Sequence, residues 1–291
     1  MINDQATIFF CVACRQANLQ PNSTELICPA CHTTFPLVDG IPIFQPSLEQ
    51  QQSVHPQENG DLSLNDIQST YDLAYSHDGL MGTDLDKTYD QFTKETLLNF
   101  GAPLQHKSVL DIGTGIGNLW QYVHDEVDGH ALDLSLVGVT KAKQTYDHLT
   151  VSVAVAEYLP YPDNYFDFII AADTLEHTLS PQQALTEIHR VLKPNGILAA
   201  SFPIPDSLRK WGRNQLLQNF WNPKFVFRLV KILAKRTLLF GRPDFQPIDR
   251  DYTPDEWLNF LQQTGFQAQP AILWPPQPEI PIVTLVASQK I

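Results

Sequence analysis

Short apolar runs alternate with helical patterns through the middle of the chain. The runs cover 108–112, 129–134, 151–155, 168–172 and 197–202, and they have the length of buried strands. The run at 168–172 is apolar throughout, which is typical of a central parallel strand. Between the last two runs, apolar residues recur at helical spacing, at Ala184, Leu185, Ile188, Val191 and Leu192. Strands that alternate with helices predict an α/β domain with a mostly parallel sheet.

The segment before the first run begins with polar residues and then turns helical. Residues 47–65 are rich in Gln, Pro, Ser and Glu, which is the composition of a linker. A helical pattern begins at Asp66, and a second helix is predicted over 83–100, where Gly101 ends it.

The segment after the last run predicts one helix and two strands. Thr253 is a strong helix cap, Pro254 suits the first turn, and Gly265 ends the helix. Candidate strands follow at 266–274 and 280–287.

The whole chain is acidic. It has 291 residues, of which 43% are hydrophobic, and a formal net charge of −13. This length allows one full α/β domain and a smaller module, and the charge disfavours a nucleic-acid substrate because a polyanion would be repelled. The N-terminus shows no basic region followed by an apolar core, and no apolar run reaches the ~18 residues of a membrane span. We therefore expect a cytoplasmic protein.

Three glycines, Gly113, Gly115 and Gly117, follow the run at 108–112 at alternate positions. A strand, a glycine turn and a helix start let the backbone approach a nucleotide-like ligand closely. No Gly-Lys-Ser/Thr sequence follows, so the loop is not a phosphate-binding P-loop. Asp111, two residues before the first glycine, would repel a pyrophosphate, but it suits a ligand with an ammonium and a sulfonium group.

Asp133 ends the second predicted strand. A carboxylate at a strand end, beyond a glycine loop, can accept hydrogen bonds from both hydroxyls of a ribose. The alternative is that Asp133 caps a helix that begins near Ser135.

At these residues the chain resembles the class I S-adenosylmethionine (SAM)-dependent methyltransferases, whose V-L-D-x-G-x-G-x-G sequence it matches at 109–117. Residues 156–167, A-E-Y-L-P-Y-P-D-N-Y-F-D, and 190–198, R-V-L-K-P-N-G-I-L, are similar to further family segments. The resemblance covers 66–202 and 251–291. It implies a Rossmann-like, seven-stranded, mostly parallel sheet with helices on both faces, in which 266–274 and 280–287 form the final antiparallel pair.

The resemblance also implies a set of SAM-binding residues. Tyr71 would lie over the cofactor, and the alternative is a core aromatic. The Asp that usually contacts the adenine amino group aligns with Val155, which leaves backbone groups near Ala156 to hold the ring. Glu157 would assist them or be solvated. The full set is Tyr71, Asp111, Gly113, Gly115, Gly117, Asp133, Leu134, Ala156, Glu157 and Asp173.

The sequence Asp-Thr-Leu-Glu-His at 173–177 follows a predicted central strand, at the edge where open α/β sheets bind ligands. Histidine side chains commonly exchange protons in catalysis, so His177 could remove a proton from an attacking hydroxyl and is our candidate catalytic residue. The D-x-x-E-H pattern also resembles the E-x-x-E-H of ubiquinone-pathway O-methyltransferases, which binds a divalent cation. The alternative is that His177 only packs the loop.

All four cysteines lie in two C-x-x-C pairs separated by thirteen residues, Cys11 with Cys14 and Cys28 with Cys31. Two such pairs can supply four thiolates to one tetrahedral Zn²⁺, and a metal would stabilise so short a segment. A redox pair is the alternative, against which the matched spacing argues. Residues 35–44 resemble the end of small zinc-ribbon-like proteins that activate certain tRNA and release-factor methyltransferases. We expect residues 1–46 to be a zinc-ribbon-like docking or substrate-contacting module.

The segment 203–250 is the least similar to the family. Nine of the chain's 19 basic residues lie between 207 and 243, where there is no acidic residue. Pro223 suits the start of a basic amphipathic helix, which is typical of a membrane surface or an anion-facing surface. We expect an inserted lid over a hydrophobic acceptor, with peripheral membrane contact through 223–240. A helix that only packs on the core and an RNA-binding patch are the alternatives.

Together these features predict a SAM-dependent methyltransferase domain over 66–291 that acts on a small or lipid-like acceptor, at an oxygen atom. One alternative is an rRNA or tRNA methyltransferase that uses the zinc module and the basic segment. The other is a SAM-binding regulator without catalysis, for which Val155 is the only direct support.

Overall fold

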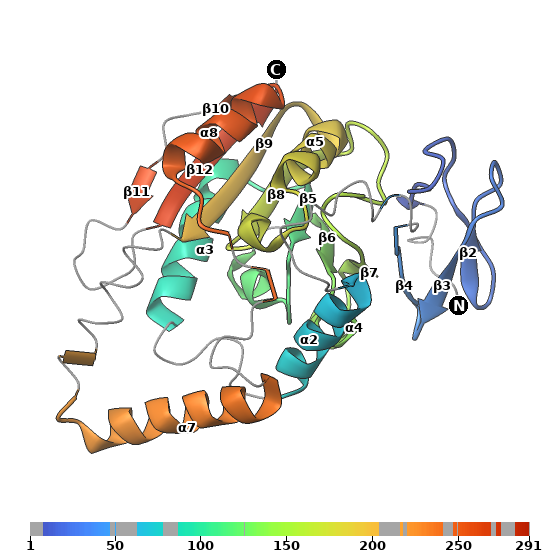
Figure 1. Cartoon of the computed structure of the whole chain (residues 1–291). Helices are drawn as coiled ribbons and strands as arrows, with labels where there is room; N and C mark the ends of the chain where they lie inside the picture. The colour runs from blue at the N-terminus through green and yellow to red at the C-terminus, as the bar shows by residue number, and fades with distance from the viewer. Residues whose placement is uncertain are drawn as a thin grey trace.

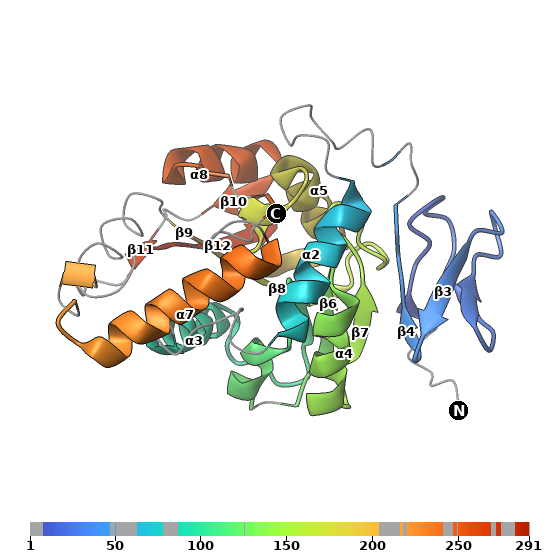
Figure 2. The ribbon, with the colours of Figure 1, turned by 60° about the horizontal axis from the view of Figure 1, so that its bottom comes forward.

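The computed structural model describes residues 8–46, 50, 63–77, 87–124, 126–203, 216–217, 220–240, 247–248, 250–268, 272–274 and 283–290. Its centre is a sheet with helices on both faces, α5 (Pro181–Val191) and α8 (Pro254–Gln263) on one and α3 (Lys87–Gly101) and α4 (Leu136–Thr145) on the other (Figures 1 and 2). This is the α/β architecture that the alternating runs predict.

Five parallel strands make up most of the sheet: β5 (Ser108–Ile112), β6 (Asp128–Asp133), β7 (Thr150–Val153), β8 (Phe166–Ala172) and β9 (Leu192–Pro203). Their order is β7-β6-β5-β8-β9, so the chain turns back between β5 and β8. In open α/β sheets this reversal creates a crevice beyond the carboxyl ends of the strands.

The far edge of the sheet differs from the expected seven strands. β12 (Val283–Lys290) runs antiparallel to β9, and both β10 (Phe266–Ala268) and β11 (Ile272–Trp274) pair with β12, which gives eight strands. The single strand expected over 266–274 is therefore two strands. Pro270 stands between them in the sequence, and proline has no N–H to give to a ladder.

The α-helices of the described residues include α2 (Leu64–Ser76), α3 (Lys87–Gly101), α4 (Leu136–Thr145), α5 (Pro181–Val191), α7 (Pro223–Phe240) and α8 (Pro254–Gln263), and the short 3-10 helices include η3 (Asn118–Tyr122) and η4 (Leu175–His177). α2 begins two residues before the expected Asp66, because Ser63 and Asp66 form a reciprocal capping box. The segment 193–196, just before the apolar run at 197–202, lies inside β9 as an irregularity between the pairs Phe166–Leu192 and Phe168–Ile197.

The N-terminal module is a small antiparallel sheet of β1 (Gln20–Pro21), β2 (Glu25–Ile27), β3 (Thr34–Val38) and β4 (Ile41–Pro42). It sits beside β7 at the edge of the large sheet (Figure 1). Ile43 bridges Val153 in parallel, and the Phe44 amide donates to the Val153 carbonyl over 2.8 Å.

The module and the large domain also share one apolar core. Phe9 packs on Phe44 and on the buried Tyr161, with ring centroids 5.1 and 5.6 Å apart. The module is therefore part of the domain's own packing. No helix in the described part of the chain is long and apolar enough to cross a bilayer.

Candidate active site

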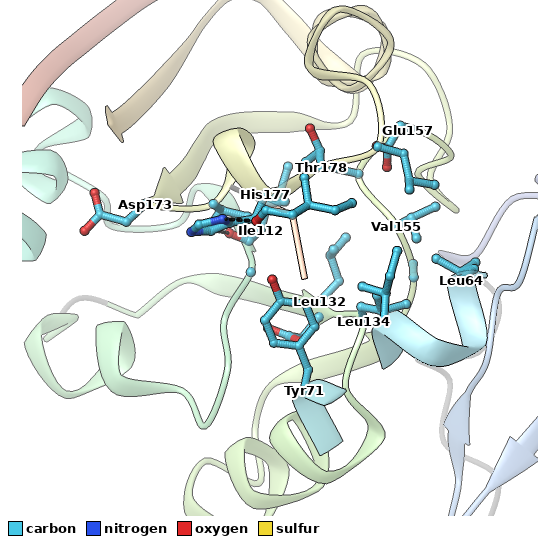
Figure 3. A pocket seen from close by; sticks show the side chains of 18 of the residues that line it. Leu64, Tyr71, Ile112, Leu132, Leu134, Val155, Glu157, Asp173, His177 and Thr178 are labelled. Atoms are coloured by element: carbon cyan, nitrogen blue, oxygen red, sulfur yellow. Dashed lines mark hydrogen bonds between the residues drawn. The ribbon is translucent and has the colours of Figure 1, made fainter. Parts of the chain in front are cut away.

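A pocket opens beyond the carboxyl ends of β5, β6, β7 and β8, at the reversal of strand order (Figure 3). Most of its wall is apolar, and α2 supplies one side through Leu64, Ile67, Tyr71 and Tyr75. Eight of the predicted site residues line it: Tyr71, Gly113, Asp133, Leu134, Ala156, Glu157, Asp173 and His177.

Asp133 is the buried carboxylate of this pocket, with 8% of its surface exposed. Its Oδ2 accepts from the Gly115 amide and its Oδ1 from the Ser135 amide, each over 2.8 Å. Burial raises the pKa of Asp133 to about 6, against these hydrogen bonds. Each carboxylate oxygen keeps a further lone pair, so Asp133 can still accept from a ligand hydroxyl. Ser135, and not Asp133, caps α4 with its side chain.

The glycine loop is held in a conformation that glycine favours. Gly113 has φ +75°, and a Cβ there would overlap the Thr174 side chain. The Thr174 hydroxyl lies 2.9 Å from the Ala172 carbonyl oxygen and 3.2 Å from the Ile112 carbonyl oxygen, and its one proton is shared between them. This contact brings the loop after β5 against the loop after β8.

Three predicted cofactor residues do not line the pocket. Asp111 is buried, and its Oδ2 has no hydrogen-bond partner among the described residues. Burial raises the pKa of Asp111 to about 6, and the Thr114 hydroxyl nearby opposes this shift. Gly115 lies under Tyr75, and Gly117 lies against Ala142 and Tyr146 at the start of η3. These residues shape the loop from behind its pocket face.

The expectation that Glu157 is solvated is wrong. Glu157 is 1% exposed, and its Oε1 accepts from the Ser180 amide, at the start of α5, over 2.9 Å. Burial raises the pKa of its carboxyl group, while the Ser180 hydrogen bond lowers it. The side chain therefore ties the loop after β7 to α5, in addition to lining the pocket.

Helix α2 is fixed over the pocket by polar contacts to α4. Asp72 accepts from the Ser135 hydroxyl over 2.5 Å and from the Val137 amide over 3.1 Å. The Lys141 ammonium donates to the Tyr75 carbonyl over 2.7 Å. Tyr75 lies one turn beyond Tyr71 on the same helix face and was missed by the sequence analysis, although the i, i+4 spacing of two tyrosines could have indicated it.

His177 lies on η4 at the pocket wall, with 17% of its side chain exposed. Its Nδ1 is 2.7 Å from the Ile248 carbonyl oxygen (Figure 3). A carbonyl can only accept, so Nδ1 carries a proton and Nε2 of the neutral ring keeps its lone pair. Arg250 adds hydrogen bonds to the carbonyls of Thr178 and Leu179.

These contacts define what the segment 203–250 contributes to the site. Within its described part, only Ile248 lines the pocket, and α7 does not. In the residues that the structure describes, the segment 203–250 contributes to the pocket wall at its C-terminal end, and α7 takes no part in the wall.

The residues of the D-x-x-E-H pattern do not gather as three cation ligands in the described part of the chain. Asp173, in the left-handed region with φ +48°, accepts from the Ser201 hydroxyl over 2.8 Å. Its carboxyl group points away from the apolar end of the pocket formed by Leu64 and Val155 (Figure 3).

The four cysteines of the module do gather, with all Sγ atoms within 4.8 Å of one another. Cys11 and Cys31 are 3.7 Å apart, and Cys14 and Cys28 are 3.6 Å apart. A tetrahedral Zn²⁺ with bonds of about 2.3 Å requires sulfur separations of about 3.8 Å, which these distances match.

Comparisons with known proteins find methyltransferases. Residues 110–200 match the family model described as "Methyltransferase domain". The chain is 28% identical over 177 residues to the probable methyltransferase LtbC of Aspergillus luteorubrus, covering 55% of this chain and 57% of that protein. It is 29% identical over 184 residues to the ubiquinone/menaquinone biosynthesis C-methyltransferase UbiE of Cellvibrio japonicus, covering 59% of this chain and 68% of that protein.

The fold is similar to the solved N-methyltransferase NodS of Bradyrhizobium japonicum, in complex with S-adenosyl-L-homocysteine, with a TM-score of 0.53 and 12% identity over 77% of this chain and 98% of that one. The chain spans little more than half the length of LtbC and about two thirds of that of UbiE. The family match and the relatives show that the chain carries a SAM-dependent methyltransferase domain, and the likeness to NodS concerns its fold.

Proposed function

We propose that this protein transfers the methyl group of SAM to a small, lipid-like acceptor at an oxygen atom. The observation that carries the proposal is the pocket at the reversal of strand order, whose mostly apolar wall includes the glycine loop after β5 and a buried carboxylate at the end of β6. A SAM-binding regulator without catalysis would also need the glycine loop and Asp133. It would have no use for a base such as His177 in the same pocket wall.

The residues present fit SAM. Asp133 would accept from the ribose hydroxyls, and Leu134, Val155 and Ala156 would enclose the adenine ring with apolar surface. Asp111 holds a buried carboxylate oxygen without a protein partner behind the glycine loop, which offers negative potential to the ammonium and sulfonium groups. Asp111 would act through the loop, because it does not line the pocket itself.

The chemistry that SAM supplies is a methyl group already activated by the sulfonium, so the protein mainly positions the reactants and excludes water. His177 would take the proton of the acceptor hydroxyl at Nε2. Glu176 Oε1 lies 3.7 Å from Nε2 and would stabilise the positive charge that forms on the ring. Ile248 would keep the ring oriented throughout.

The apolar wall supports a lipid-like acceptor. The relative from Cellvibrio japonicus is named for ubiquinone and menaquinone biosynthesis and for methylation at carbon. Removal of a proton from an aromatic hydroxyl also makes the neighbouring ring carbon nucleophilic, so the same base could serve a carbon acceptor.

In the module, Cys11, Cys14, Cys28 and Cys31 would hold a structural Zn²⁺. Four sulfur ligands fill a tetrahedral shell, so this ion would leave no open position for chemistry. Its role would be to stabilise the module that packs against β7.

Isotopically labelled SAM tests the proposal directly. The full chain is incubated with labelled SAM and a cell extract, and the products are separated into lipid, small polar molecules and RNA. We expect label in the lipid fraction only when active protein is present. Chemical demethylation of the labelled product then distinguishes a methyl group on oxygen from one on carbon. Label found only in RNA would contradict the proposed acceptor.

A further inference from the structure

Helix α7 stands apart from the layers of the sheet (Figures 1 and 2) and exposes large apolar side chains. Phe227 is 72% exposed, Val230 58% and Leu238 85%, and these residues recur at the spacing of one helix face. Just before the helix, Trp221 is 87% exposed and Phe220 is 59% exposed. Soluble surfaces seldom carry so many large apolar groups together, so this face fits a partner.

A basic stripe adjoins the apolar face. The sequence places Lys224, Arg228, Lys231 and Lys235 at intervals of four, three and four residues, and no acidic residue occurs between 207 and 243. At 100° per residue this stripe is next to the face of Phe227, Val230 and Leu238. Lys224 and Lys231 are exposed. The stripe contrasts with the rest of a chain whose formal net charge is −13.

We infer that α7, with Phe220 and Trp221, is an interfacial helix that binds the surface of an anionic lipid membrane. Its apolar face would enter the boundary of headgroups and acyl chains, and the basic stripe would contact the anionic headgroups. Exposed aromatic residues at the start of the helix suit the same boundary. An anionic lipid surface is complementary to both features, because it places negative headgroups beside an apolar layer.

The helix also lies where membrane contact would serve the pocket. The C-terminal end of α7 is near α2 in both views, and α2 lines the pocket with Tyr71 and Tyr75 (Figures 1 and 2). Ile248, eight residues beyond α7, also lines the pocket. A membrane bound by α7 would therefore lie close to the pocket, from which an acceptor could enter. This consequence rests on the proposed function, whereas the lipid binding itself does not.

Co-sedimentation of the full chain with vesicles tests the inference. One set of vesicles is phosphatidylcholine alone, and the other contains phosphatidylcholine and phosphatidylglycerol in equal parts. The variants are the double substitution Phe227→Asp/Leu238→Asp and the double substitution Lys224→Glu/Lys231→Glu. Val38→Asp and Lys143→Glu, on the module and on α4, are matched controls for the apolar and the charge changes.

We expect binding to the anionic vesicles only, weakened by added salt, and a fall in partition of roughly tenfold or more in each α7 variant. The controls should bind as the unaltered protein does. All six substituted residues are at least partly exposed, so the midpoint of thermal unfolding should remain similar. Failure of the unaltered protein to bind anionic vesicles, or α7 variants that bind normally, would overturn the inference.

The protein could instead self-associate through α7 and not bind vesicles, with the α7 substitutions abolishing the self-association. That result would make this face a protein interface and would also overturn the lipid inference. Calorimetry with SAM on the same preparations is an independent readout. Normal SAM binding without vesicle binding rejects the lipid inference alone, and the reverse result rejects the proposed function alone.

Discussion

Nδ1 of His177 lies 2.7 Å from the carbonyl oxygen of Ile248, 71 residues further along the chain. This single contact sets the tautomer of the proposed base and ties the end of the inserted segment to the pocket wall. Its Nε2 lies 3.7 Å from Oε1 of Glu176, so both ring nitrogens have a neighbouring oxygen atom.

Replacement of His177 by Gln should lower the rate of methyl transfer roughly 10²–10⁴-fold, the usual contribution of a general base. SAM affinity should change little, because the ring is proposed to act on the acceptor. Turnover with labelled SAM and calorimetry measure the two effects. His148→Gln, at an exposed position on the surface, is the control. Unchanged turnover in His177→Gln would dismiss the base.

The pH dependence of SAM binding reports on the buried carboxylates. Burial raises the pKa of both Asp133 and Asp111 to about 6, so each is ionised above that pH and protonated below it. SAM favours the ionised forms, because ribose hydroxyls donate to Asp133 and positive charge is attracted to Asp111. The affinity for SAM should therefore fall as the pH drops through about 6. Near that pH, SAM binding should release protons from these carboxyl groups.

Asp133→Asn removes one of the two titrating groups. The variant should bind SAM more weakly at neutral pH and should show a shallower loss of affinity towards acid pH, due to Asp111 alone. Calorimetry between about pH 5 and pH 8 gives both values. An affinity that does not vary over this range would rule out both carboxylates as determinants of binding.

Local patterns were sufficient to predict much of this site from the sequence. The apolar runs gave the five parallel strands, and the alternate glycines placed the loop after β5, because strand burial and glycine turns are properties of neighbouring residues. The burial of Glu157 could not be predicted in this way. Its carboxylate accepts from the Ser180 amide, 23 residues away, and no local pattern specifies that partner.

The sequence predicts a docking or substrate-contacting module at the N-terminus, but not the place where it docks. The Phe44 amide donates to the Val153 carbonyl of the large sheet. The contacts join segments more than a hundred residues apart, and an apolar run does not say which partner it will meet. The contact of His177 with Ile248 escaped prediction for the same reason.

Arg15 connects this module to the loop that lines the pocket. Its Nη2 lies 2.8 Å from Oε1 of the buried Glu187, whose Oε2 accepts from the Leu159 amide over 3.1 Å. Arg15→Ala should lower the free energy of unfolding by about 1 kcal/mol, a modest effect because Arg15 is partly exposed and Glu187 keeps its ion pair with Arg190. Denaturant unfolding measures the change.

SAM affinity should fall in the same variant if the module holds the loop of Ala154 to Glu157 in place. Lys143→Ala, which removes a basic side chain from α4, is the matched control and should leave both values unchanged. An Arg15→Ala protein with normal stability and normal SAM affinity would mean that the module does not support the loop.

The four cysteines predict one Zn²⁺ per chain. Removal of the metal with a chelator should lower the midpoint of thermal unfolding, because thiolates held near one another without a cation repel and the module loses its staple. Metal analysis and differential scanning calorimetry measure the two quantities. A well-folded, metal-free chain with four titratable thiols would refute the zinc site.

The central claim is that the pocket beside Asp133 and the glycine loop binds the methyl donor. Calorimetric titration of the full chain with SAM and with S-adenosyl-L-homocysteine tests it most directly. We predict one-to-one binding of both ligands, weakened at least tenfold by Asp133→Ala, since a buried acceptor for two ribose hydroxyls is lost. No binding of either ligand to the folded, metal-loaded protein would contradict the account.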